Sequence, residues 1–66
     1  MKEYEKVRIK ATGITGEIID IYHPANGKTM YTVESDEKGV PGGRGDTDSW
    51  KLFDCEESEL ERIDAP

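Results

Sequence analysis

Cysteine and histidine are almost absent from this chain of 66 residues, which has one of each. The single cysteine, Cys55, allows no disulfide within the chain, whereas small secreted domains commonly depend on disulfides. The first residues, Met1–Glu5, lack the apolar core of a signal peptide. No apolar run in the sequence is long enough to span a bilayer. We therefore predict a cytoplasmic protein that does not enter a membrane.

The scarcity of these two residue types also leaves little catalytic or metal-binding chemistry. His23 has no second ligand at a metal spacing, and it stands beside Pro24 in a turn. Cys55 lies among carboxylates, which raise a thiol pKa, so we expect a small buried residue rather than a nucleophile. Asp46 and Asp48 could share a divalent cation, but the closing glutamate of a calcium loop is missing. We predict no enzyme, no catalytic residue, no cofactor and no metal site.

Basic charge is scarce as well. The chain has 9 Lys and Arg residues against 15 Asp and Glu residues, which gives a formal net charge of -6. Such a chain repels a phosphate backbone. One small basic cluster lies on a face of the first predicted strand, where it also protects an edge strand from pairing: Lys6, Arg8 and Lys10. Nucleic-acid binding through this cluster and the Arg44 loop is the alternative hypothesis, not the leading one.

Apolar residues form only 33% of the chain, but they follow strand patterns. Val7 and Ile9 alternate with basic residues, and Tyr31 and Val33 share the face that we expect to be the core. The run 18–21 has apolar residues at both even and odd positions, so both faces of the strand carry them. This is typical of a strand that bends at a barrel corner. The predicted elements are strands at 6–11, 16–23, 28–35 and 49–54, a helical turn at 55–58, and a closing strand with Leu60 inward.

The segment 36–48 contains four glycines and one proline, too many breakers for a regular element. We expect a flexible loop, either functional or merely mobile. Within it, 44–46 matches the Arg-Gly-Asp tripeptide read by integrins, a weak signal for an intracellular protein. Near the C-terminus a full helix capped by Asp54 is the alternative to a single turn, although its face would carry few apolar residues.

Several short motifs accompany these predicted elements: Val7-x-Ile9, Gly13-x-x-Gly16-x-Ile18, Gly16–Asp20, Tyr31-x-Val33 and Glu57–Glu61. Together with five short strands and a one-turn helix before the last one, they resemble an SH3-like barrel. The opening resembles a KOW-type barrel, and the ending resembles small bacterial and prophage-encoded SH3-like proteins of unknown function. The resemblance implies a single all-β domain over residues 1–66, a five-stranded SH3-like barrel with a 3-10 helix before the last strand.

The chain departs from the better-known relatives at their binding sites. Peptide-binding SH3 domains have a long acidic first loop and an Ala-Leu-Tyr-Asp-Tyr-like strand, whereas the first loop here is Thr12–Gly16 and the tyrosine motif is missing. KOW domains that bind RNA carry basic loops, unlike this acidic chain. Mimicry of a phosphate backbone by the acidic surface is a further possibility, supported by charge alone.

The leading hypothesis is therefore a non-catalytic protein-interaction module that acts as a monomer on a basic protein partner. Exposed aromatic residues are the usual anchors of such contacts, and carboxylates steer a basic partner. Two of the aromatic candidates, Tyr31 and Trp50, could belong to the core instead. The candidate partner-binding residues are Tyr22, Tyr31 and Trp50 as anchors, with Glu56, Glu57 and Glu61 as steering charges.

Overall fold

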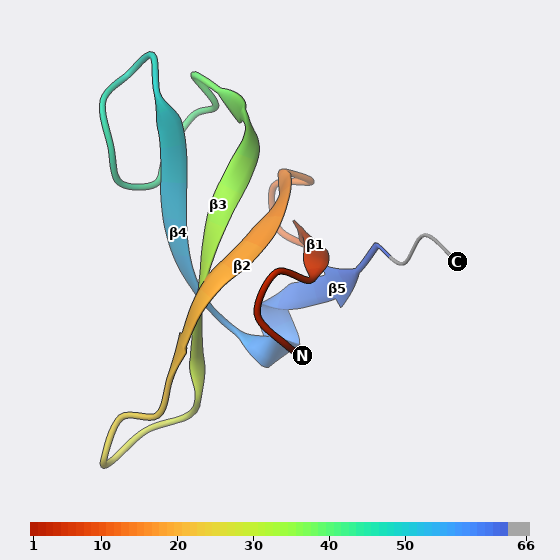
Figure 1. Ribbon diagram of the computed structural model, residues 1–66, viewed down its shortest axis with the longest axis vertical. Coiled ribbons are helices and arrows are strands. Elements are labelled where there is room, and N and C mark those ends of the chain that lie inside the picture. Colours follow the sequence, from red (N-terminus) through yellow and green to blue (C-terminus); the bar gives the residue numbers. More distant parts are fainter. Residues whose placement is uncertain (64–66) are drawn as a thin grey trace.

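The computed structural model describes residues 1–63, which form a single antiparallel sheet and one short 3-10 helix (Figure 1). The strand order is β4-β3-β2-β1-β5. This confirms the predicted all-β fold with five strands and one turn of 3-10 helix before the last strand, and it excludes the longer C-terminal helix over these residues. The elements are β1 Lys6–Ile9, β2 Thr15–Tyr22, β3 Met30–Lys38, β4 Trp50–Glu56, η1 Glu57–Glu59 and β5 Leu60–Arg62.

The expectation that the sheet closes into a barrel is wrong. β4 and β5 are the two opposite edges of the sheet and do not pair with each other. The outer edge of β4 is occupied instead by other groups of the chain. Arg44 forms an isolated bridge with Leu52, and the Glu59 carboxylate accepts a hydrogen bond from the backbone N–H of Glu56. These contacts use backbone groups that would otherwise be available for closure.

β2 is the strand around which the sheet bends. Its pairing with β3 shifts register between Ile18 and Asp20, so one extra residue interrupts the ladder. This bulge confirms the bend predicted from the apolar run 18–21. Gly16 lies on the same strand where β3 approaches closely. A Cβ atom added there would collide with the carbonyl oxygen of Glu34 and lie 2.7 Å from Cγ1 of Val33, so the position requires glycine.

The core lies on the concave side of this bent sheet. Tyr31 and Val33 are buried as predicted, and Leu60 points inward from β5. Cys55 is a small buried core residue, also as predicted. Partly buried Ile21 and Phe53 extend the cluster. The buried apolar residues of the described chain are Val7, Ile9, Ile18, Tyr31, Val33, Cys55 and Leu60.

The segment 36–48 begins within a strand and then contacts β4. β3 continues through Lys38, so the first part of the expected loop is strand. The remainder folds back onto β4, where the ammonium of the buried Lys51 donates to the carbonyl of Gly42 at 2.9 Å. Arg44 adds the bridge to β4 described above. Long-range contacts therefore shape this loop despite its glycines.

Other boundaries differ by a few residues. β1 ends at Ile9 instead of residue 11, because the carbonyl of Ile9 already accepts the N–H of Gly13 at 2.8 Å to begin the turn. The 3-10 helix occupies Glu57–Glu59 rather than 55–58, because Cys55 and Glu56 belong to β4.

Candidate interaction surface

The convex side of β2, β3 and β4 presents a second set of side chains, opposite the core. Directly paired residues in an antiparallel sheet share a face, and alternate residues of a strand return to it. The pairings Tyr22 with Met30 and Met30 with Glu56 therefore place one residue from each strand in a row. We call this side the outer face, and it comprises Glu17, Asp20 and Tyr22 of β2, Met30, Thr32, Glu34 and Lys38 of β3, and Trp50, Leu52, Asp54 and Glu56 of β4.

Trp50 stands at one end of the outer face and is 50% exposed. Nζ of Lys38 lies 4.4 Å from the centroid of its ring, a cation–π contact between paired residues of β3 and β4. Core placement of Trp50, which the sequence analysis left open, is therefore not observed. Successive side chains of a strand point to opposite faces. Because Lys51 and Cys55 face inward, Trp50 faces outward.

Tyr22 stands at the other end of the outer face and is 44% exposed. It belongs to the row that contains Glu56, six residues from Trp50 along β4. At a rise of about 3.3 Å per residue, the two aromatic residues are about 20 Å apart along the sheet. A single contact surface of ordinary size can include both.

Tyr31, the third predicted anchor, is only 5% exposed and lies in the core. It pairs with Ile21 on β2 and Cys55 on β4, all on the inner side of the sheet. Its aromatic ring is therefore part of the packing and is not available to a partner. Of the two roles left open for Tyr31, the structure supports the core.

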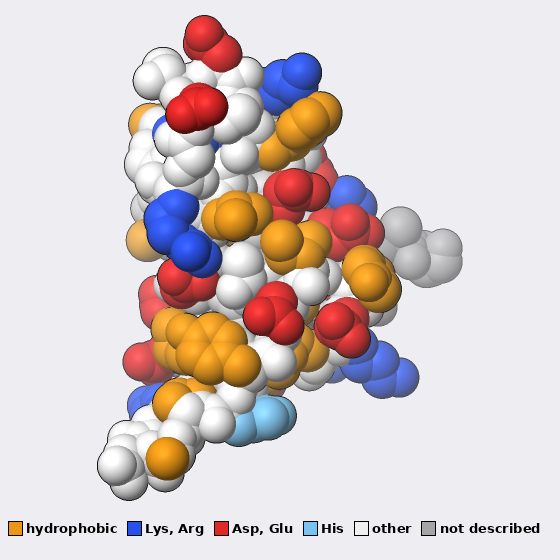
Figure 2. All heavy atoms as spheres, turned by 60° about the vertical axis from the view of Figure 1, so that its left-hand side comes forward, with side chains coloured by type: hydrophobic (Ala, Val, Ile, Leu, Met, Phe, Trp, Pro, Cys, Tyr) orange, Lys and Arg blue, Asp and Glu red, His pale blue; other side chains and the backbone are white. Residues whose placement is uncertain are grey.

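Acidic side chains occupy the middle of the outer face. Asp20 pairs with Thr32 across β2 and β3, and Glu34 lies two residues from Thr32 on β3. Within residues 1–63, neither carboxylate has an ion-pair partner. Figure 2 shows acidic side chains interspersed among hydrophobic ones on the face that it displays. These two carboxylates could not be recognised as neighbours from the sequence, because only the strand register brings them together.

Other charges of the outer face are already paired. The guanidinium of Arg44 donates to Oδ1 of Asp54 at 2.9 Å, and the hydroxyl of Thr32 donates to the same oxygen at 3.1 Å. Nζ of Lys28 lies 3.7 Å from Oε1 of Glu56. The remaining unpaired charge at the centre of the face is consequently negative.

The three predicted steering glutamates are not brought together. Glu61 lies on β5, where its carboxylate accepts a hydrogen bond from Arg8 at 2.7 Å. Glu56 caps η1 in a reciprocal arrangement with Glu59, and Glu57 is exposed in the same turn. Only Glu56 belongs to the outer face, at the Tyr22 end.

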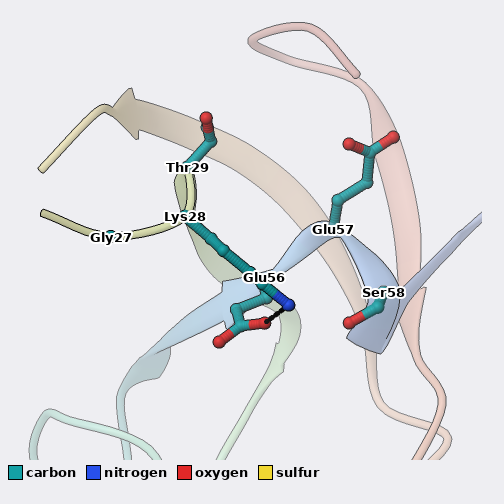
Figure 3. A pocket seen from close by; sticks show the side chains of 6 residues that line it. All are labelled: Gly27, Lys28, Thr29, Glu56, Glu57 and Ser58. Atoms are coloured by element: carbon teal, nitrogen blue, oxygen red, sulfur yellow. Dashed lines mark ion pairs between the residues drawn. The ribbon is translucent and has the colours of Figure 1, made fainter.

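Glu56 and Glu57 do share an open hollow between η1 and the turn that joins β2 to β3. Its volume is about 580 Å³. In Figure 3, the side chain of Lys28 extends toward Glu56, whereas Glu57 points away from that pair. The ion pair therefore lies inside the hollow and partly neutralises it. The lining residues are Gly27, Lys28, Thr29, Glu56, Glu57 and Ser58.

The basic residues of the alternative hypothesis mostly face carboxylates. Nζ of Lys6 donates to Oδ1 of Asp36 at 2.7 Å, and Arg8 and Arg44 are paired as described. The hydrogen bond with Asp36 is the main reason that the pKa of Lys6 is raised, and it lowers the pKa of Asp36 in turn. Nucleic-acid binding remains a prediction, which no contact within residues 1–63 favours.

Cys55 and His23 are the two residues whose reactive side chains the sequence singled out. Burial, followed by the nearby charges of Glu59 and Asp54, raises the pKa of the Cys55 thiol to about 11. The expected direction was right, although burial contributes more than the carboxylates. Nδ1 of the exposed His23 lies 2.9 Å from the hydroxyl of Thr29 across the β2–β3 turn.

No protein-family model, curated protein or solved structure matches this chain. Among residues 1–63, helices long and apolar enough to cross a bilayer are absent.

Proposed function

We propose that this chain is a non-catalytic protein-interaction module that binds a partner through the outer face of β2, β3 and β4. The observation that carries the proposal is the exposure of Trp50 and Tyr22 at the two ends of one sheet face. Tryptophan and tyrosine are the side chains that most often anchor protein interfaces. Their burial by a partner removes large apolar areas from water, which favours association.

The partner is a basic protein. Asp20 and Glu34 lie between the two aromatic residues without ion-pair partners in the described chain, and the whole chain has a formal net charge of -6. Complementary charge accelerates encounter and selects among partners more than it adds affinity. The aromatic anchors therefore supply most of the binding free energy, and the carboxylates supply preference for a basic surface.

The SH3-like relation is part of the same proposal. Five antiparallel strands with a one-turn 3-10 helix immediately before the last strand support it, although the sheet is open. Relation to the small bacterial and prophage-encoded members rests on the opening Gly13-x-x-Gly16 and the ending Glu57–Glu61. Fold alone does not determine function in this class, so the outer face and not the relation carries the interaction proposal.

Partner capture by matched variants tests the proposal. The tagged chain is incubated with native lysate, with and without nuclease treatment, and captured proteins are quantified by mass spectrometry. Trp50→Ala and Tyr22→Ala each remove one anchor side chain, and each of these residues is about half exposed. Tyr4→Asn is the control, because Tyr4 is 69% exposed outside the outer face. Its φ of 67° suits asparagine, which tolerates the left-handed region.

We expect one protein to be enriched by the unmodified chain and by Tyr4→Asn, and to be lost with both anchor variants. Each alanine substitution of an anchor should weaken capture about tenfold or more, which is the effect of removing an interface hot spot. Circular dichroism confirms that the variants remain folded. Equal capture by all four chains would contradict the proposal, and enrichment that disappears with nuclease would favour the nucleic-acid alternative.

A further inference from the structure

The two central carboxylates of the outer face lie at a spacing with a specific meaning. Asp20 is directly opposite Thr32, and Glu34 follows Thr32 by two residues, so the two acids are diagonal neighbours across β2 and β3. Diagonal neighbours on one face of an antiparallel pair are about 7–8 Å apart. In an extended chain, side chains at alternate positions lie on one side and repeat at about 6.6–6.8 Å. The spacing of the two carboxylates nearly matches this repeat.

The nearby cations of the chain are already engaged elsewhere. Arg44 is bound to Asp54 at 2.9 Å, and Lys38 lies over the ring of Trp50. Asp20 and Glu34, together with Glu17 directly opposite Glu34, therefore form a group of like charges that lacks an ion-pair partner within residues 1–63. Like charges near each other on a sheet destabilise it slightly, and cations from a partner would relieve the repulsion.

Trp50 adds a third element to the same face. Nζ of Lys38 lies 4.4 Å from the centroid of the ring, so the π system already makes one cation–π contact. Half of this side chain remains exposed, and it offers area on which an arginine guanidinium can stack. The distance from Trp50 to the Tyr22 row corresponds to six residues of extended chain.

We infer that the outer face binds an extended polypeptide segment that carries basic side chains at alternate positions, two of which pair with Asp20 and Glu34. This inference rests on the proposed function and specifies its partner. The two carboxylates act as specificity-determining residues, while Trp50 and Tyr22 hold the ends of the segment. A segment with the same number of cations grouped together satisfies only one carboxylate at a time and binds less tightly.

Two synthetic peptides of equal composition provide the probe. One alternates arginine and serine over about seven residues, which spans about 20 Å when extended. The other has the same residues with all arginines consecutive. Binding is followed by chemical shifts of backbone amides in heteronuclear NMR spectra and by the indole N–H of Trp50. We expect the alternating peptide to bind about three- to tenfold more tightly and to shift the amides of Asp20 and Glu34.

Two double variants distinguish binding by the local carboxylates from attraction by the overall charge of the chain. Asp20→Asn with Glu34→Gln should weaken the alternating peptide about tenfold, since exposed ion pairs contribute modestly and two are lost. Glu3→Gln with Glu57→Gln gives the same net charge from exposed residues outside the outer face, and should change binding less than about twofold.

Equal weakening by the two double variants would overturn the inference, because attraction would then be non-specific. Failure of the alternating peptide to bind, equal affinity for both peptides, or preference for a DNA duplex over both peptides would also overturn it. These failures leave the proposed function intact when partner capture still depends on Trp50 and Tyr22. Loss of that dependence would remove the proposed function itself.

Discussion

The backbones of Arg44 and Leu52 pair in both directions. The N–H of Arg44 donates to the carbonyl of Leu52 at 2.8 Å, and the N–H of Leu52 donates to the carbonyl of Arg44 at 2.9 Å. Because Leu52 belongs to β4, an edge strand of the sheet, this bridge occupies the groups that another strand would use. The Arg44 side chain strengthens the contact through Asp54. The loop thus protects the sheet against strand addition.

Arg44→Pro tests this protective contact, because proline has no backbone N–H to donate. We expect the amide of Leu52 to exchange its hydrogen at least about tenfold faster, because loss of the N–H donor at position 44 weakens the bridge in which Leu52 donates to the carbonyl of residue 44. Light scattering at high protein concentration should show association through the exposed edge. Arg44→Ala is the control, because it keeps the backbone bridge and removes only the side-chain ion pair. Unchanged exchange at Leu52 in the proline variant would contradict the account.

Gly16→Ala should destabilise the domain by about 1–3 kcal/mol, the usual cost of overpacking. The added Cβ would strike the backbone of Glu34 and the side chain of Val33, both on β3. Gly27→Ala is the matched control, because its Cβ would meet only the ring of Pro24 at 3.3 Å. Urea unfolding measures both variants, and equal stabilities would show that the strands have room to separate.

Asp36→Asn should change how stability depends on pH. The hydrogen bond from Lys6 holds the pKa of Asp36 below its ordinary value of 3.8, so the ionised form stabilises the folded state. That stability is present above the ordinary pKa and is lost as pH falls through the lowered folded-state pKa. The variant should lose less than about 1 kcal/mol at neutral pH, because the pair is exposed.

Thermal unfolding of the two chains across acidic pH checks this prediction. The melting temperatures should differ at neutral pH and converge as Asp36 becomes protonated. The raised pKa of Lys6 predicts a second convergence at alkaline pH, as the ammonium loses its proton above its ordinary value of 10.5. A constant difference over the whole range would mean that the substitution acts through packing. Glu3→Gln serves as an exposed control.

Cys55 should react slowly with thiol reagents. With a pKa of about 11, mainly from burial, the thiol is almost wholly protonated at neutral pH. At pH about 8, we expect a disulfide reagent to modify the folded chain at least about a hundredfold more slowly than the urea-unfolded chain, whose thiol has a pKa of about 8.5. The absorbance of the released thiolate follows both reactions. Similar rates would show that Cys55 is open to solvent.

The parts of this fold that follow from local patterns could be predicted. Alternation at Tyr31 and Val33 identified the inner face of β3, and the apolar run 18–21 predicted a bend in β2, where the structure has a bulge. Leu60 was correctly placed in the core because it is isolated among charged residues. Strand patterns of this kind report which side of a strand is buried, and they do so without knowledge of the neighbours.

The remainder depends on contacts between distant residues. β4 is apolar on both parities, with Trp50 and Leu52 on one and Phe53 and Cys55 on the other, so the sequence does not indicate which side faces inward. The inner side includes Lys51, whose buried ammonium is satisfied by a loop carbonyl.

The candidate site was predicted only in part for the same reason. Tyr22 and Trp50 are surface residues as required of anchors, whereas Tyr31 is not. The central acids Asp20 and Glu34 stand fourteen positions apart in sequence and become neighbours only through the register of β2 and β3. The acidic C-terminal segment drew attention because of its composition, but Glu61 is paired with Arg8 on another part of the sheet.

Site-specific photo-crosslinking tests the central claim most directly. A photoreactive phenylalanine analogue replaces Trp50, Tyr22 or Tyr4 in turn, and each chain is irradiated in native lysate. The proposed function predicts that the first two positions crosslink to the same protein and that position 4, which is more exposed but outside the outer face, does not. Crosslinks from position 4 alone, or to different proteins from positions 22 and 50, would contradict a single contact surface on the outer face.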